Sequence, residues 1–189
     1  MDAVFTINYG EFKIADILSK KVKCSIFIPS SRQEKGIDLI MYRFSEMKNM
    51  ISTVQVKQSR VFEKQKIIDV DNKKINIVGS LWFNKINVPD NADWIMLIGM
   101  RFVETKQKDN FSCDDFILDP LVLAFKNDEM KEFSNSIKQK LNPNKNDHSF
   151  YISFDKKGNV YQTRGCAENR ILNRFLLKNR IEEIEKSFK

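Results

Sequence analysis

The chain is poor in the residues that build zinc sites and disulfide frameworks. Its 189 residues include only three cysteines, which lie far apart in the sequence, and one histidine. No two cysteines form a C-x-x-C pair, so a structural zinc site is not expected. An odd and sparse cysteine count also argues against the disulfide scaffold of a small secreted protein.

Long apolar runs are also lacking. No segment approaches the roughly 20 apolar residues that a membrane-spanning helix needs. Residues 1–13, MDAVFTINYGEFK, contain an early acid and no long apolar stretch, so a signal peptide is not expected. The sequence therefore predicts a cytoplasmic protein with no membrane partner. The P-loop, G-x-S-x-G and dinucleotide-binding motifs are missing as well.

Basic residues are present in excess. The chain has 32 Lys and Arg against 25 Asp and Glu, which gives a formal net charge of +7. Hydrophobic residues make up 42% of the chain, enough for a core, and the length predicts a single domain over residues 1–189. A basic balance suits a polyanionic partner such as nucleic acid, although many basic proteins bind none.

Apolar periodicity predicts helices and strands in mixed order. Helical spacing competes with a strand over residues 75–86, and residues 87–93 read as a loop. The remaining expected elements are a helix at 9–21, strands at 22–29, 37–44 and 51–59, a hairpin within 64–78 that turns near Asp71-Asn72, strands at 94–103 and 114–125, a helix at 127–141, a hairpin within 149–164 and a C-terminal helix over about 168–188. The predicted fold class is α/β (α+β), with a mixed central β-sheet flanked by helices.

Two of these strands carry polar residues that a core does not favour. Asp38 lies in IDLIMY, and Gln55 and Lys57 lie in STVQVKQ. Residues two apart in a strand share a face, so Gln55 and Lys57 project together, with Val54 and Val56 opposite. Antiparallel pairing of the two strands would place Asp38 beside the end of the second one.

A glutamate in the first predicted helix is able to approach the same edge. Glu11 lies on the helical face of Ile14, Ala15 and Leu18, although a first-turn acid is also favoured by the helix dipole alone. Buried carboxylates and ammonium groups pair with each other or bind a metal. The residue types alone fit either a metal site or an ion pair without catalytic duty.

The order of these residues resembles the motif of the PD-(D/E)XK nuclease superfamily, which includes restriction endonucleases, junction resolvases and repair nucleases. That motif has an acid on the second strand of a helix–strand–strand–strand core and an acid-x-Lys on the third. Asp38 matches the first acid, and Gln55-Val56-Lys57 matches the acid-x-Lys, with glutamine in place of the acid. Glu11 resembles the first-helix glutamate of many members. The resemblance covers about residues 9–60 and implies a restriction endonuclease-like core.

The resemblance also implies a division of labour. Mg²⁺ (or Mn²⁺) would be held by Asp38, the Gln55 side-chain oxygen, the Val56 backbone carbonyl and Glu11, while Lys57 would orient or deprotonate the attacking water. The implied activity is hydrolysis of phosphodiester bonds in DNA by a restriction-like or defence endonuclease, and the implied assembly is a homodimer.

Two alternatives stay open. Because Gln55 removes a negative charge, the chain also fits a catalytically inactive nuclease-fold module that binds nucleic acid or a protein partner. The other alternative is an unrelated α/β domain in which Asp38 and Lys57 form an internal ion pair.

Further candidates are weaker. Arg60 follows the motif, and Arg170, Arg174 and Lys178 recur every four residues on the predicted C-terminal helix, as either a phosphate-binding stripe or a solvated face. Asp114 and Asp115 are better explained as a loop or a cap than as metal ligands. Trp82 and Trp94 are predicted to serve the core. His148 has no evident partner in the sequence.

Overall fold

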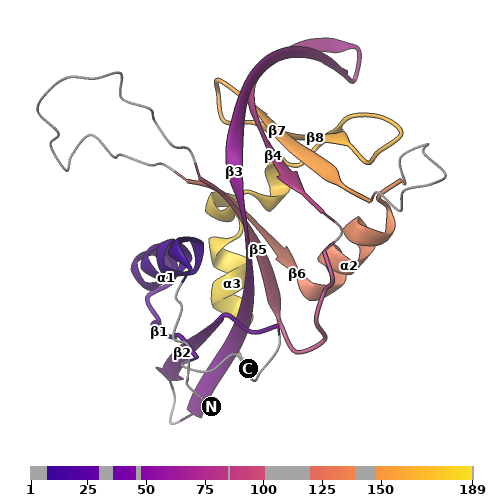
Figure 1. Ribbon diagram of the computed structural model, residues 1–189. Helices are drawn as coiled ribbons and strands as arrows, with labels where there is room; N and C mark the ends of the chain where they lie inside the picture. Colours follow the sequence, from indigo (N-terminus) through magenta and orange to yellow (C-terminus); the bar gives the residue numbers. More distant parts are fainter. Residues whose placement is uncertain are drawn as a thin grey trace, which may run out of the picture.

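The computed structural model of the protein describes residues 8–29, 36–45, 48–84, 86–100, 120–138 and 148–188 (Figure 1). Asp114, Asp115 and the first half of the predicted strand at 114–125 lie outside these residues. The described elements are α1 (Tyr9–Lys21), β1 (Ser25–Phe27), β2 (Leu39–Ser45), β3 (Lys48–Val70), β4 (Lys73–Phe83), β5 (Trp94–Met100), β6 (Leu121–Lys126), α2 (Asn127–Asn135), β7 (Phe150–Asp155), β8 (Val160–Arg164), β9 (Arg170–Ile171), the 3-10 turns η2 (Asn173–Phe175) and η3 (Leu177–Asn179), and α3 (Ile181–Lys186). No described helix combines the length and apolarity needed to cross a bilayer.

The long strand β3 organises the sheet. Its first part, up to Val54, pairs antiparallel with β2, and its last part, from Val61 to Val70, pairs antiparallel with β4. Between them, residues 54–60 pair in parallel with β5. The other described pairings, β1–β2, β5–β6, β4–β7, β7–β8 and β8–β9, are antiparallel. The fold is therefore mixed α+β with a mostly antiparallel sheet, which confirms the predicted class at this level.

Two hydrophobic clusters pack against the middle of the sheet. One holds Val54 and Val56 of β3 together with Ile14 and Leu18 of α1, so α1 covers this face of β3. The other cluster joins β5 and β6 to β4, β7, β8 and α2. Figure 1 shows α1 beside β3 and the far end of β3 arching toward β7 and β8. The alternation along β3 confirms that the two valines face away from Gln55 and Lys57.

The predicted first helix forms with the predicted bounds. Asn8 is its N-cap, and Glu11 at the third helical position completes a capping box by accepting from the Asn8 backbone N–H. Lys20 and Lys21 in the last turn complement the negative end of the helix dipole. Local signals therefore determine this helix.

The hairpin between β3 and β4 turns at the predicted dipeptide. Asp71 and Asn72 have φ of 49° and 62°, the left-handed pair that a tight hairpin turn requires. Residues 75–83 belong to β4 and not to the competing helix, because Ile77, Leu81 and Phe83 are buried by two-residue alternation. Trp82, between the last two, is 40% exposed. Its prediction as a core residue is wrong.

The predicted helix over 168–188 is also wrong, because only α3 is a regular α-helix there. Leu172 and Phe175 pack into the cluster between β5 and β7, whereas Leu177 and Ile184 pack into the cluster beneath α1. A single straight helix cannot place side chains in both of these clusters. The chain instead breaks at Leu176, whose φ of −56° and ψ of 131° are extended and separate η2 from η3. Arg170, Arg174 and Lys178 therefore do not share one helical face.

A carboxylate holds the turn between β7 and β8. The oxygens of Asp155 accept from the backbone N–H of Lys157 (2.8 Å) and Asn159 (2.9 Å), from Asn159 Nδ2 (2.8 Å) and from Tyr161 Oη (3.1 Å). Burial alone would raise the pKa of Asp155, but these hydrogen bonds outweigh it and lower the pKa. The ionised form is therefore the one that the fold stabilises.

Replacing Asp155 by asparagine should lower the free energy of unfolding at pH 7 by about 1–3 kcal/mol. Because the folded-state pKa lies below the ordinary value of about 4, the contribution is complete above that value and disappears as the pH falls through the folded-state pKa. Melting curves of wild type and Asp155→Asn at pH 7 and pH 3 test this. A difference that stays constant between the two pH values would contradict the ionic role.

Candidate functional site

Strands β2 and β3 bring Asp38 to the middle of the Gln-Val-Lys motif. The Asp38 backbone N–H donates to the Val54 carbonyl at 2.9 Å, and the ladder proper begins at the Leu39–Val54 pair. The Val56 N–H donates to Asp38 Oδ2 at 2.7 Å, so a carboxylate oxygen replaces the carbonyl of a ladder partner. The N–H and C=O of one strand residue point toward the same neighbour. The Val56 carbonyl therefore points to the side of β3 on which Asp38 lies.

Gln55 presents a buried oxygen at this point. The residue is 6% exposed, and its Oε1 has no hydrogen-bond partner among the described residues. A buried acceptor left in this state costs about 1–3 kcal/mol, and such groups are rare in folded proteins. Asp38 stands opposite Gln55, because the next residue, Leu39, pairs with Val54. An amide oxygen and a carboxylate from facing positions suit a bound hard cation or an ordered water.

Lys57 lies two residues further along and projects from the same face as Gln55. Its side chain is half-buried. Within the part of the chain that the structure describes, the Lys57 ammonium forms no ion pair with Asp38 or any other carboxylate. The internal ion pair that one alternative required is therefore not formed, and the ammonium is available to another anion.

Glu11 is placed beside the motif but on the other face of β3. It is 6% exposed, and its Oε2 accepts from the Asn8 N–H at 3.3 Å. The first turn of α1 docks on β3 one residue beyond Lys57, where the Gly10 N–H donates to Gln58 Oε1 at 3.0 Å. A Cβ at Gly10 would lie 2.6 Å from that oxygen and 3.1 Å from Ile98 Cγ2, so a larger residue would displace the Gln58 side chain.

The segment between β4 and β5 contacts the residues that flank the site in β3 and just before Asp38. A Cβ at Gly36, two residues before Asp38, would lie 2.4 Å from the Pro89 Cβ. The Thr53 N–H donates to Asp93 Oδ2 at 2.9 Å, and the Thr53 hydroxyl donates to the Asn91 carbonyl at 2.8 Å. The sequence predicts only a loop here, since these contacts are long-range and leave no local pattern.

The charge of the site is low for a metal centre. Over the described residues, no group of three or more His, Cys, Asp or Glu side chains is placed to hold a metal ion. A cation at Asp38 would have that carboxylate, the Gln55 Oε1 and the Val56 carbonyl as protein ligands. These are oxygen ligands of the kind that Mg²⁺ and Mn²⁺ accept, with water completing the shell.

The predicted basic stripe near the C-terminus is dispersed. Arg170 donates to Gln162 Oε1 at 2.6 Å and to Ser136 Oγ at 3.0 Å, and the Arg174 guanidinium lies 4.5 Å from the ring centroid of Phe175. Both arginines line a cavity of about 280 Å³ that Glu129 and Glu132 also line. Lys178 lies in η3 and is exposed. This mixture of signs does not favour phosphate.

Comparison of the chain with protein-family models, with curated proteins and with solved structures finds no match. The functional interpretation therefore rests on the residues and their geometry.

Proposed function

We propose that the protein is a metal-dependent nuclease that hydrolyses phosphodiester bonds in DNA, with a restriction endonuclease-like core over residues 9–60. The observation that carries the proposal is the buried, unpartnered Oε1 of Gln55, the residue that stands opposite Asp38 across β2 and β3. Lys57, free of ion pairs within the described chain, shares the face of Gln55.

Each residue has a defined part in this proposal. Asp38 provides the anionic ligand and is oriented by the Val56 N–H, while Gln55 Oε1 and the Val56 carbonyl add neutral oxygens. A bound Mg²⁺ or Mn²⁺ supplies neutralisation of charge on the scissile phosphate. The Lys57 ammonium orients the attacking water and stabilises the developing negative charge. Glu11 caps α1 on the opposite face of β3 and is left out of this ligand set.

A second candidate function is a catalytically inactive nuclease-fold module that binds nucleic acid. One observation favours it: the described residues form no group of three or more His, Cys, Asp or Glu side chains that could hold a metal ion, and Gln55 stands where the motif has an acid. A weakly charged site holds a cation less tightly than one with two carboxylates.

Incubation of the purified protein with plasmid, linear and branched DNA distinguishes the nuclease from the inactive binding module. The enzyme hypothesis expects nicking that requires Mg²⁺ or Mn²⁺ and stops when EDTA is added. Binding of DNA without cleavage under every metal condition would support the inactive module. Absence of both binding and cleavage would contradict both hypotheses. Sedimentation with and without DNA tests the homodimer that the resemblance implies.

Changing Gln55 to glutamate should raise metal affinity and lower the metal concentration needed for half-maximal cleavage. The substitution adds a negative charge beside Asp38 at little steric cost, and cations of this class prefer carboxylates. Calorimetric titration with Mn²⁺ measures the change. Gln65→Glu is the matched control, since it adds the same charge at an exposed position of the same strand.

A purely structural Gln55 gives the opposite pattern. The new carboxylate would then be buried without a cation, and the fold should lose roughly 1–3 kcal/mol. Unchanged Mn²⁺ binding together with a lowered melting temperature would remove Gln55 from the ligand set.

A further inference from the structure

Four side chains form a row across adjacent strands, at some distance from Asp38. Trp82 of β4 pairs with Tyr151 of β7, and Tyr151 pairs with Arg164 of β8. Arg60 of β3 precedes Val61, the partner of Leu81, so it stands opposite Trp82. The order across the sheet is therefore arginine, tryptophan, tyrosine, arginine. We call these four residues the aromatic row.

The aromatic row lies on the outer face of this part of the sheet. Leu81 and Phe83 flank Trp82 in β4 and belong to the buried cluster, as Phe150 and Ile152 do around Tyr151. Alternation therefore turns Trp82 and Tyr151 outward. The register shift between Tyr151 and Ile152 is a bulge, and bulges re-aim the side chains next to them.

Each arginine of the row lies against an aromatic ring. The Arg60 guanidinium carbon is 4.6 Å from the ring centroid of Phe62, which is 40% exposed. The Arg164 guanidinium carbon is 5.1 Å from the ring centroid of Tyr151, and Arg164 Nη1 donates to Tyr151 Oη at 3.4 Å. Cation–π contacts restrict the two guanidinium groups and place positive charge at both ends of the row.

A large exposed tryptophan needs an explanation in a chain that buries its other tryptophan. Trp82 is 40% exposed, whereas Trp94 is 1% exposed. The row itself contains no acid, and next to it Ser80, Ser153 and Thr163 form a neutral chain of hydroxyl groups. An exposed aromatic surface between two arginines is complementary to bases linked by phosphates.

We propose that the outer face of β3, β4, β7 and β8 binds an unpaired nucleic-acid strand, with bases stacked on Trp82 and Tyr151 and phosphates held by Arg60 and Arg164. Four strands at ~4.8 Å spacing span about 14 Å, and aromatic residues on a four-stranded sheet stack two or three bases. A duplex keeps its base faces covered, so this surface selects unpaired strands.

The inference takes its ligand class from the proposed function but uses a different surface. Lys57 lies three residues before Arg60, about 10 Å along β3, and projects from the opposite face. Strand binding and cleavage therefore depend on different side chains. Strand binding is measured in EDTA and cleavage in Mg²⁺ or Mn²⁺, so failure of one hypothesis can be told from failure of the other.

Fluorescence anisotropy of a labelled 15-nucleotide oligo-dT, in EDTA to prevent cleavage, measures the binding. We expect Trp82→Ala to weaken it about 5- to 100-fold, the usual loss for one stacked base. Arg60→Gln with Arg164→Gln should also weaken it and reduce the slope of log K against log salt by about 1.4. A base stacked on Trp82 should quench the tryptophan fluorescence of the wild-type protein. Trp82→Phe should keep most of the affinity but show no such quenching, because the remaining tryptophan, Trp94, is buried.

Matched controls are available elsewhere on the surface. Phe44→Ala removes a ring that is 65% exposed on β2, and Lys20→Gln with Lys131→Gln removes two positive charges from α1 and α2. Both should bind as wild type does. Far-ultraviolet circular dichroism checks that each variant is folded.

Three results would overturn the proposal. The first is duplex binding as tight as single-strand binding by the wild type. The second is unchanged affinity in folded Trp82→Ala. The third is self-association of the wild type that disappears in Trp82→Ala, which would assign the face to a second copy of the chain.

Discussion

Lys57→Ala should reduce metal-dependent cleavage of DNA by about 100- to 10,000-fold, the range for loss of a general acid–base group. The ammonium projects from the same face as Gln55 and has no ion-pair partner among the described residues. Removing it therefore breaks no internal ion pair, and we expect the melting temperature to change little. A turnover assay on supercoiled plasmid in Mg²⁺ and in Mn²⁺ measures the loss.

Two further variants make this result specific. Lys66→Ala removes the same charge from an exposed position of β3 and should cleave as wild type does. Asp38→Asn keeps an oxygen that can accept the Val56 N–H but removes the anionic ligand, so it should abolish cleavage without unfolding the protein. Full activity in Lys57→Ala would exclude the proposed catalytic role, whatever the behaviour of Asp38→Asn.

Local sequence signals are enough to predict the helix and the strands that form the candidate site. The Asn8–Glu11 capping box and the apolar stripe define α1, and the dipeptide Asp71-Asn72 defines the β3–β4 turn. Asp38 was expected beside the third strand because a short connection implies antiparallel pairing, and the contact with Val56 confirms that placement. The face shared by Gln55 and Lys57 followed from two-residue periodicity alone.

The remaining features depend on long-range packing. The C-terminal pattern suggested one helix because Leu177, Ile181 and Ile184 have helical spacing, yet Phe175 must reach a different cluster. Trp82 looked like a core residue because hydrophobicity does not tell which face of a strand is covered. The unpartnered oxygen of Gln55 could not be foreseen either, since it depends on every group that surrounds the side chain.

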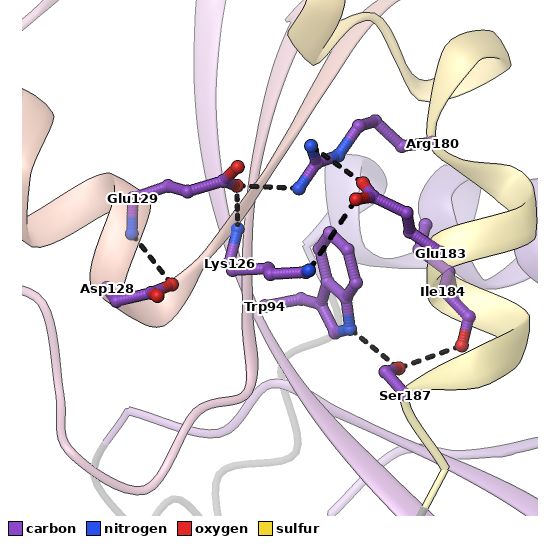
Figure 2. A network of polar contacts seen from close by, with 8 residues as sticks. All are labelled: Trp94, Lys126, Asp128, Glu129, Arg180, Glu183, Ile184 and Ser187. Carbon is purple, nitrogen blue, oxygen red and sulfur yellow. Dashed lines mark hydrogen bonds and ion pairs between the residues drawn. The ribbon is translucent and has the colours of Figure 1, made fainter.

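Arg180 connects the C-terminal segment to α2 and β5 and is the most buried cation in the described structure (Figure 2). The residue is 7% exposed, and its Nη2 and Nη1 lie 2.6 Å and 2.7 Å from oxygens of Glu129 and Glu183. Its guanidinium carbon lies 5.3 Å from the ring centroid of Trp94. The indole N–H of Trp94 donates to Ser187 Oγ at 2.9 Å, which ties α3 to β5.

Arg180→Met should lower the free energy of unfolding by about 3 kcal/mol, the lower end of the range for removing one partner of a buried ion pair. The lower end applies because the Glu183 side chain is 43% exposed and keeps Lys126 at 3.6 Å. For a chain of this size the melting temperature should fall by roughly 6–12 °C. The exposed pair of Lys131 and Asp90 provides the control, and Lys131→Ala should leave the melting temperature almost unchanged.

A combined variant identifies the cause of the loss. Adding Glu129→Gln and Glu183→Gln to Arg180→Met removes the carboxylates that lack a cation, and part of the lost stability should return. Trp94 pairs with Val54, the residue before Gln55, so loosening of α3 reaches the strand that carries the motif. We therefore expect Arg180→Met to keep the metal dependence of cleavage at low temperature and to lose activity at its lowered melting temperature. An unchanged melting temperature in Arg180→Met would show that this network contributes nothing to the fold.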